Sequence, residues 1–158
     1  MPLTRHETLN ADIAAAAAHL RSVDGGAVQR LYTVGFCFGG RLSYLQAASA
    51  IDAAGVIGFY GPPVGPNRAG LPAPADEAQR FTCPVLAISG GADRGIGPEA
   101  VQAFEQAMDR AGVAHTTVTY PGAPHSFFDR HSSEHADASV DAWRKMLTFM
   151  GVTGAASG

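Results

Sequence analysis

Four short apolar runs alternate with longer helix-like segments along this chain of 158 residues, and this alternation constrains the fold more than any other feature. The runs are rich in β-branched and aromatic residues, which favour strands. They lie at residues 31–36, 55–60, 84–89 and 115–120, and the helix-like segments lie at residues 8–23, 39–50, 98–111 and 134–150. Strands separated by helices predict βαβ units, so we expect a three-layer α/β/α fold with a mostly parallel sheet.

These elements make one domain, for which we predict the bounds 1–150, because the length suits a single core and no internal repeat is present. Residues 61–81 differ from the rest because they contain five prolines. We expect a long irregular loop there, of the kind that is functional or mobile. The small and polar residues 151–158 predict a disordered tail.

Charge and hydropathy exclude several classes of protein. The formal net charge is −3 and no run of Lys and Arg occurs, so we expect no nucleic-acid partner. The alanine-rich stretch 11–20 contains Asp12 and His19 and is too short and too polar to span a membrane. The first seven residues do not resemble a signal peptide, so we place the protein in the cytoplasm. In that compartment Cys37 and Cys83 are expected to stay reduced.

The sequence around Cys37 has the form of a nucleophile elbow, glycine–x–nucleophile–x–glycine, between a predicted strand and a predicted helix. Such a turn is tight, and we expect Gly35 and Gly39 to keep Cβ atoms out of it. The thiol then stands at a helix N-terminus, where the N–H of Phe38 is the expected oxyanion donor. A buried structural cysteine between glycines is the alternative interpretation of this motif alone.

Two further residues follow the ends of predicted strands. Asp93 comes after the third strand and His125 after the fourth. Nucleophile, acid and histidine then occur in the chain order typical of α/β-hydrolases, and all three lie at carboxyl ends of strands, where parallel sheets place their sites. A turn or helix cap at Asp93 and a surface histidine at residue 125 are the alternatives.

Together these motifs resemble the dienelactone hydrolase family. The resemblance is carried by residues 35–40, by Gly91-Ala92-Asp93 with Gly97-Pro98, by residues 124–127 and by Tyr60-Gly61. It implies an α/β-hydrolase fold and cleavage of a small lactone or ester of the carboxymethylenebutenolidase type. The catalytic residues would be Cys37, Asp93 and His125, and the resemblance implies no cofactor and no metal. Tyr60 and Phe127 are the candidates for substrate contact.

The chain also departs from that family. Members extend upstream of the nucleophile strand, whereas one helix precedes it here. The family carries strands, a second oxyanion donor, an acidic residue and an arginine upstream, and none of these has a counterpart here. An Arg also follows the histidine by a few residues in some members, and Arg130 lies near that position. We therefore expect a truncated fold, in which the strand at 31–36 forms a sheet edge and favours a homodimer.

Other interpretations remain open. His131, Glu134 and His135 match an inverted zinc-protease pattern, H-x-x-E-H, but the match lies at a predicted helix start and lacks a third ligand. A catalytically weak or inactive remnant that acts as an interaction module is the main alternative function. Another fold with an elbow cysteine, such as that of the glutamine amidotransferases, is a weaker one.

Overall fold

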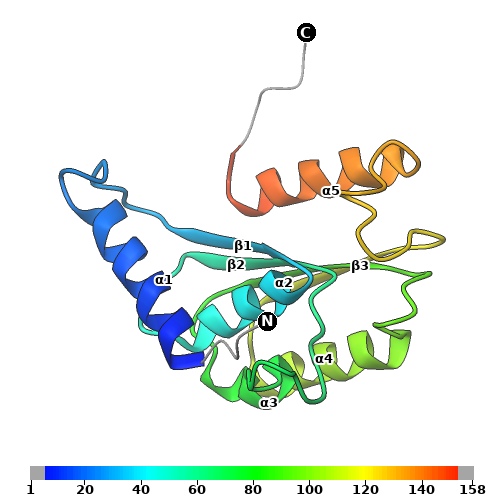
Figure 1. Ribbon diagram of the computed structural model, residues 1–158, viewed down its shortest axis with the longest axis horizontal. Helices are drawn as coiled ribbons and strands as arrows, with labels where there is room; N and C mark the ends of the chain where they lie inside the picture. The colour runs from blue at the N-terminus through cyan, green and yellow to red at the C-terminus, as the bar shows by residue number, and fades with distance from the viewer. Residues whose placement is uncertain (1–5, 153–158) are drawn as a thin grey trace, which may run out of the picture.

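The computed structural model describes residues 6–152 and has a parallel sheet at its centre (Figure 1). Within that range the sheet has four strands in the order β1-β2-β3-β4, and each neighbouring pair is parallel. The strands are β1 (Tyr32–Phe36), β2 (Gly55–Phe59), β3 (Val85–Gly90) and β4 (His115–Tyr120). The predicted α/β class and the parallel sheet are confirmed.

Helices cover both faces of the sheet, as Figure 1 shows. The helix α5 lies on one face, and α2, α3 and α4 lie on the other, with α1 beside β1. Their bounds are α1 (His6–Arg21), α2 (Phe38–Leu45), α3 (Pro74–Glu77), α4 (Pro98–Ala111) and α5 (Ala136–Phe149).

Alternation along the strands produces two cores, one on each face of the sheet. Val56 and Val85 pack with the α2 and α4 side chains, which include Tyr44 and Phe104. Ile57, Leu86 and Ile88 point the other way and pack with Ala142 and Met146 of α5. Every residue of β2 and β3 is buried, which explains why their sequences are apolar except for Ser89.

Several boundaries differ from the sequence prediction. The helix predicted at 39–50 ends at Leu45 and continues as the short 3-10 helix η1 (Gln46–Ala48). The predicted loop 61–81 is irregular only as far as Ala73, after which α3 and the 3-10 helix η2 (Ala78–Arg80) follow. Pro74 is tolerated because it is the first helical residue, whose N–H has no partner within a helix. Most of the predicted tail, residues 153–158, lies outside the described residues.

Arg41 holds the proline-rich loop from inside the molecule. Its side chain is 1% exposed and carries a charge, yet no carboxylate is bonded to it among the described residues. Instead the guanidinium donates to the backbone carbonyl oxygens of Pro62, Val64, Gly65, Leu71 and Pro72. Burial lowers the pKa of Arg41, and the nearby charge of Asp76 opposes that change.

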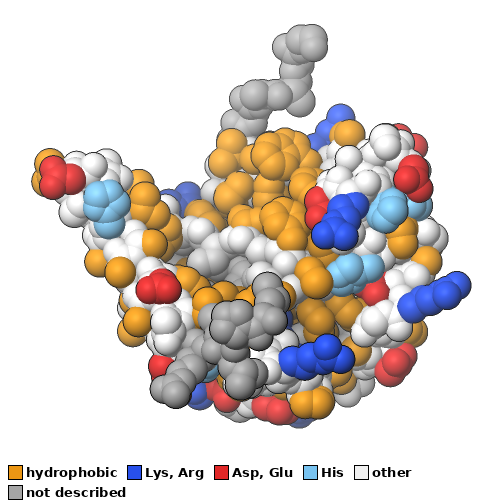
Figure 2. Space-filling view, viewed as in Figure 1, with side chains coloured by type: hydrophobic (Ala, Val, Ile, Leu, Met, Phe, Trp, Pro, Cys, Tyr) orange, Lys and Arg blue, Asp and Glu red, His pale blue; other side chains and the backbone are white. Residues whose placement is uncertain are grey.

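The strand β1 is an edge of the sheet in the described part of the chain, because it pairs with β2 alone. Val34 and Phe36 on this strand are 42% and 39% exposed. A largely apolar cavity of about 380 Å³ separates α1 from β1. Figure 2 shows hydrophobic side chains gathered over α5 and along α1, on the two sides of β1. The predicted one-sided pairing of this strand is therefore confirmed for residues 6–152.

No helix in the described range is both long enough and apolar enough to cross a membrane.

Candidate active site

Cys37 lies at the turn between β1 and α2 and has a strained backbone. Its φ of 53° and ψ of −116° are rare for a residue with a side chain. The Cys37 N–H donates to the carbonyl oxygen of Phe59 at 3.0 Å, which fixes the turn against the end of β2. The residue is exposed, so a substrate can reach the thiol.

Two glycines make this turn sterically feasible, and one of them is not the residue that we predicted. A Cβ on Gly35 would lie 1.9 Å from the carbonyl oxygen of Gly39, so the prediction for Gly35 is confirmed. A Cβ on Gly39 would meet nothing within 4 Å, so the prediction for Gly39 is wrong. The second constrained position is Gly40, whose Cβ would lie 2.7 Å from the Phe59 carbonyl oxygen because α2 crosses the end of β2 there.

The loops after β3 and β4 are bonded to each other by their backbones. Gly91 N–H donates to the Tyr120 carbonyl oxygen at 2.8 Å, and Ala92 N–H donates to that of Ala123 at 3.0 Å. These bonds bring together two loops whose functional residues are more than thirty positions apart in sequence.

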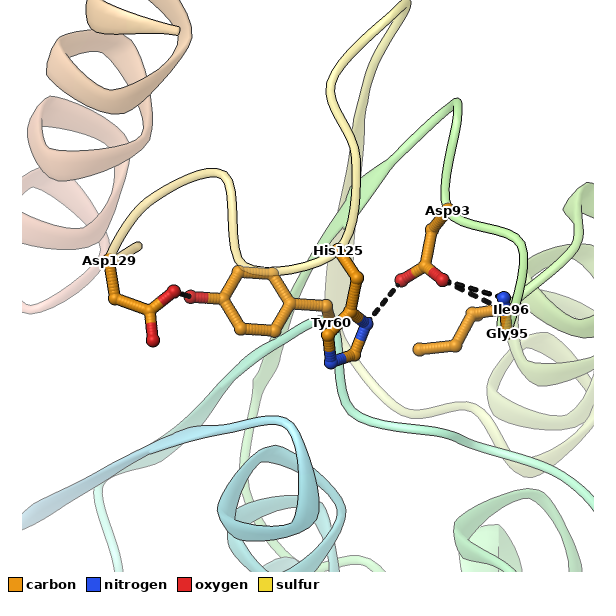
Figure 3. A network of polar contacts seen from close by, with 6 residues as sticks. All are labelled: Tyr60, Asp93, Gly95, Ile96, His125 and Asp129. Carbon is orange, nitrogen blue, oxygen red and sulfur yellow. Dashed lines mark hydrogen bonds and ion pairs between the residues drawn. The ribbon is translucent and has the colours of Figure 1, made fainter. Parts of the chain in front are cut away.

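At the tips of these loops, Asp93 is hydrogen-bonded to His125 (Figure 3). Nδ1 of His125 lies 2.6 Å from Oδ2 of Asp93. The other carboxylate oxygen accepts the backbone N–H groups of Gly95 at 2.8 Å and Ile96 at 3.2 Å. The Asp93 side chain is 2% exposed and the His125 side chain is 36% exposed. The arrangement leaves Nε2 of the imidazole free for a proton.

Cys37 and His125 both lie at the carboxyl edge of the sheet, but no hydrogen bond joins them in the described structure. Tyr60 directly follows β2 at the same edge and lies near both residues. Its ring centroid lies 5.0 Å from that of His125, and the charge of Cys37 is among the influences that raise the pKa of Tyr60. Sites of this kind often tighten only when substrate binds.

The remaining predicted residues divide into two groups. Phe38 is the first residue of α2, so its N–H has no partner within that helix and is available to an oxyanion. Tyr60 and Phe127 are both 0% exposed and offer no surface to a substrate in this structure. Their rings pack on each other with centroids 5.8 Å apart. Their contact with substrate stays a prediction, and the geometry gives them a supporting position.

A model of the dienelactone hydrolase family matches residues 2–153. This chain belongs to the dienelactone hydrolase family.

Individual relatives agree with that assignment. A Yersinia pestis protein named "Putative carboxymethylenebutenolidase" is 36% identical over 134 residues, which are 84% of this chain and 50% of the relative. A protein of the same name from Escherichia coli strain K12 is 36% identical over 81% of this chain and 48% of the relative. The chain thus spans about half the length of the curated relatives it matches.

Solved structures show the same fold. The crystal structure of a "Putative Dienelactone Hydrolase" from Klebsiella pneumoniae superposes with a TM-score of 0.85 at 30% identity, over 94% of this chain and 62% of that chain. A puromycin-hydrolyzing peptidase of Mycobacterium tuberculosis, 22% identical with a TM-score of 0.72, shares the fold over 88% of this chain and 24% of its own.

Sequence reasoning missed one polar residue beside Tyr60 and His125. Asp129 accepts a hydrogen bond of 2.9 Å from the Tyr60 hydroxyl, across 69 positions of sequence. Partial burial raises the pKa of Asp129, but hydrogen bonds from the Arg130 N–H and the Tyr60 hydroxyl outweigh it and leave the pKa below its usual value. Burial, with the contact to Asp129, raises the pKa of Tyr60. The only sequence signal was proximity to His125.

The described residues contain no cluster of three or more His, Cys, Asp or Glu side chains that could hold a metal. The pattern at 131–135 instead gives an exposed pair, with His131 Nδ1 lying 3.2 Å from Glu134 Oε1.

Proposed function

We propose that this chain carries the catalytic residues of a hydrolase that cleaves a lactone or a small carboxylic ester. Cys37 is the nucleophile, His125 the general base and Asp93 the residue that orients the imidazole. The observation that carries the proposal is the 2.6 Å contact of His125 with buried Asp93, at the same edge of the sheet as an exposed Cys37 in a strained turn. No cofactor is needed for this chemistry.

In the first half of the reaction, the sulfur of Cys37 attacks the carbonyl carbon while Nε2 of His125 takes the thiol proton. The resulting oxyanion accepts a hydrogen bond from the free N–H of Phe38 at the start of α2. The tetrahedral intermediate collapses by breaking the carbon–oxygen bond, and the leaving oxygen takes the proton back from His125. The products are a thioester on Cys37 and an alcohol, which stays attached to the acyl group when the substrate is a lactone.

In the second half, His125 takes a proton from water, and the hydroxide so formed attacks the thioester carbonyl. The carbon–sulfur bond breaks, the sulfur recovers its proton from His125 and a carboxylic acid leaves. Asp93 stabilises the imidazolium in both halves, because its buried carboxylate is held by two backbone N–H groups and by His125 itself.

The carboxymethylenebutenolidase name of the Yersinia pestis relative supports a lactone as the substrate. Both cysteines are free thiols, which suits a reducing compartment, and we keep the cytoplasm as the proposed location.

The test is hydrolysis of p-nitrophenyl acetate by the purified chain and by two matched variants. Cys37→Ala should abolish turnover, whereas Cys83→Ala should leave it unchanged because Cys83 is buried just before β3, away from the carboxyl ends of the strands. Mass spectrometry of the acid-quenched enzyme should find an acetyl group on the peptide that contains Cys37. Equal turnover by Cys37→Ala and the parent chain would exclude the proposed nucleophile, and turnover of both at the spontaneous rate would favour a non-catalytic module.

A further inference from the structure

Tyr60 fills the space behind His125 and is fixed at both of its ends. The ring is fully buried and packs against His125, Phe127 and Phe36. At its far end the hydroxyl donates to Oδ1 of Asp129 at 2.9 Å. Figure 3 shows His125 between the Asp93 carboxylate on one side and the Tyr60 ring on the other, with Asp129 beyond the hydroxyl.

Asp129 belongs to the same loop as His125 and lies four residues after it. The loop between them turns sharply, with Ser126 at a φ of 61°. The Arg130 and His131 N–H groups both donate to the Ser126 carbonyl oxygen at 3.1 Å, which closes the turn. A bond from Tyr60 to Asp129 therefore fixes the outgoing end of the loop, while the bond between Ala92 and Ala123 fixes its incoming end.

We propose that Tyr60 and Asp129 form a positioning pair that holds the His125 imidazole against Asp93 and aims its Nε2 at the nucleophile. The inference rests on the proposed function for its consequence in catalysis. Tyr60 then has a role other than substrate contact. Packing alone would not require its buried hydroxyl, whereas the bond to Asp129 does.

The reason is geometric. A single hydrogen bond through Nδ1 does not fix the imidazole against rotation about its Cα–Cβ and Cβ–Cγ bonds. Packing restrains it only in part, because the His125 side chain is 36% exposed. The Tyr60 ring blocks that rotation on one side, since the two ring centroids are 5.0 Å apart at 54°. A hydrogen bond to an ionised carboxylate is stronger than one between neutral groups, so the Asp129 charge holds the ring firmly.

The molecule contains a matched control for this pair. The Tyr120 hydroxyl donates to Oδ2 of Asp141 at 2.7 Å, which is likewise a bond from a tyrosine hydroxyl to an aspartate of a later segment. Neither residue contacts His125 among the recorded hydrogen bonds and ring pairs of the described chain. Tyr60→Phe and Tyr120→Phe each delete one hydroxyl and keep the ring.

We expect Tyr60→Phe and Asp129→Ala to lower kcat for p-nitrophenyl acetate by about 10- to 100-fold, because a misdirected base costs rate more than binding. The KM should stay within about twofold. Asp129→Asn keeps an acceptor oxygen and should retain most of the activity. Tyr120→Phe should retain full kcat even if it loses as much thermal stability as Tyr60→Phe.

A second measurement, by proton NMR, follows the position of the His125 imidazole independently of turnover. In the parent chain and in Tyr120→Phe, the proton on Nδ1 should give a sharp low-field proton NMR signal that disappears in Asp93→Ala. In Tyr60→Phe and Asp129→Ala it should broaden or shift. An unchanged signal and unchanged kcat in both variants would overturn the positioning role, as would equal losses in Tyr120→Phe. If the parent chain shows no Cys37-dependent turnover, the proposed function fails, and the NMR comparison alone decides the inference.

Discussion

Gly90 lies so close to the backbone of Ala123 that a Cβ on Gly90 would be 2.3 Å from the Ala123 carbonyl oxygen. Only glycine permits this approach, and it lets the loop after β3 bond directly to the loop after β4. The Asp93–His125 contact depends on that juxtaposition, because each residue lies within a few positions of the bonded backbone. This close backbone approach thus determines where Asp93 meets His125.

Asp93→Asn should lower kcat by roughly 10³–10⁴-fold while the fold persists. The amide can still accept the N–H groups of Gly95 and Ile96, but its NH₂ would face Nδ1 of His125 and favour the wrong tautomer. Steady-state hydrolysis of p-nitrophenyl acetate measures the effect. Asp109→Asn is the control, since Asp109 is exposed and its Oδ1 lies 3.7 Å from Nε2 of His115 at the start of β4, away from the carboxyl ends of the strands. Similar kcat values for the two variants would contradict the role of Asp93.

Cys37 should react with iodoacetamide well before Cys83. Burial, with the nearby charge of Asp52, raises the pKa of Cys83 to about 11. At pH 8 its thiolate fraction is therefore about one in a thousand, and the thiolate is the reactive form. Peptide mapping after limiting reagent should find the label on Cys37, whereas in urea both cysteines should react alike. Raising the pH toward 11 should increase the labelling of Cys83. Preferential labelling of Cys83 at pH 8 would refute this prediction.

The sequence predicts what depends on local pattern. The bounds of α4 and β4 match the prediction residue for residue, because Pro98 begins the helix, Gly112 ends it in the left-handed region, and the strand follows at once. Cys37, Asp93 and His125 are predicted as site residues because each lies within five residues of the end of a predicted strand. Two other contacts join segments that are remote in sequence: the bond between Tyr60 and Asp129, and the bonds from Arg41 to backbone carbonyl oxygens. No periodicity or motif predicts such contacts. The motif alone does not show which of Gly39 and Gly40 lacks space for a Cβ, because that depends on how α2 crosses the end of β2.

Replacing these two neighbouring glycines should have opposite effects on stability. Gly39→Ala adds a Cβ in open space within α2 and should raise the free energy of unfolding by about 0.5–1 kcal/mol. Gly40→Ala forces a Cβ against the Phe59 carbonyl oxygen and Gly61, and should lower it by roughly 1–3 kcal/mol. Urea unfolding followed by circular dichroism compares the pair. Equal midpoints would mean that the turn has more room than the structure shows.

Arg41→Leu should destabilise the protein by roughly 3–5 kcal/mol, because it leaves several buried carbonyl oxygens of the proline-rich loop without a donor. Arg41→Lys keeps the charge but loses the several N–H donors of the guanidinium, so its stability should lie between those of the leucine variant and the parent chain. Denaturant midpoints provide the ranking, and limited proteolysis should cut the leucine variant within residues 61–73. If the leucine variant is as stable as the parent, the loop is held by other contacts.

The open edge of β1 leads us to propose that the chain self-associates, as a homodimer or a larger assembly. Val34→Lys places a charge on that edge and should shift the mass found by size-exclusion chromatography with light scattering toward the monomer. Val140→Lys is the matched control, since Val140 on α5 is 48% exposed, close to the 42% of Val34, and lies off the edge strand. A parent chain that remains monomeric at high concentration would count against association through this edge.

The strand order also determines when the site becomes complete during synthesis. Each strand pairs with the one that precedes it in the chain, so the sheet can grow in the order in which it leaves the ribosome. Under the proposed mechanism, Cys37 is translated directly after β1, while its base His125 is translated only after β4. For the time that a ribosome takes to add some ninety residues, the nascent chain therefore carries a nucleophile without its base, and the docking of β4 is the event that switches the chemistry on.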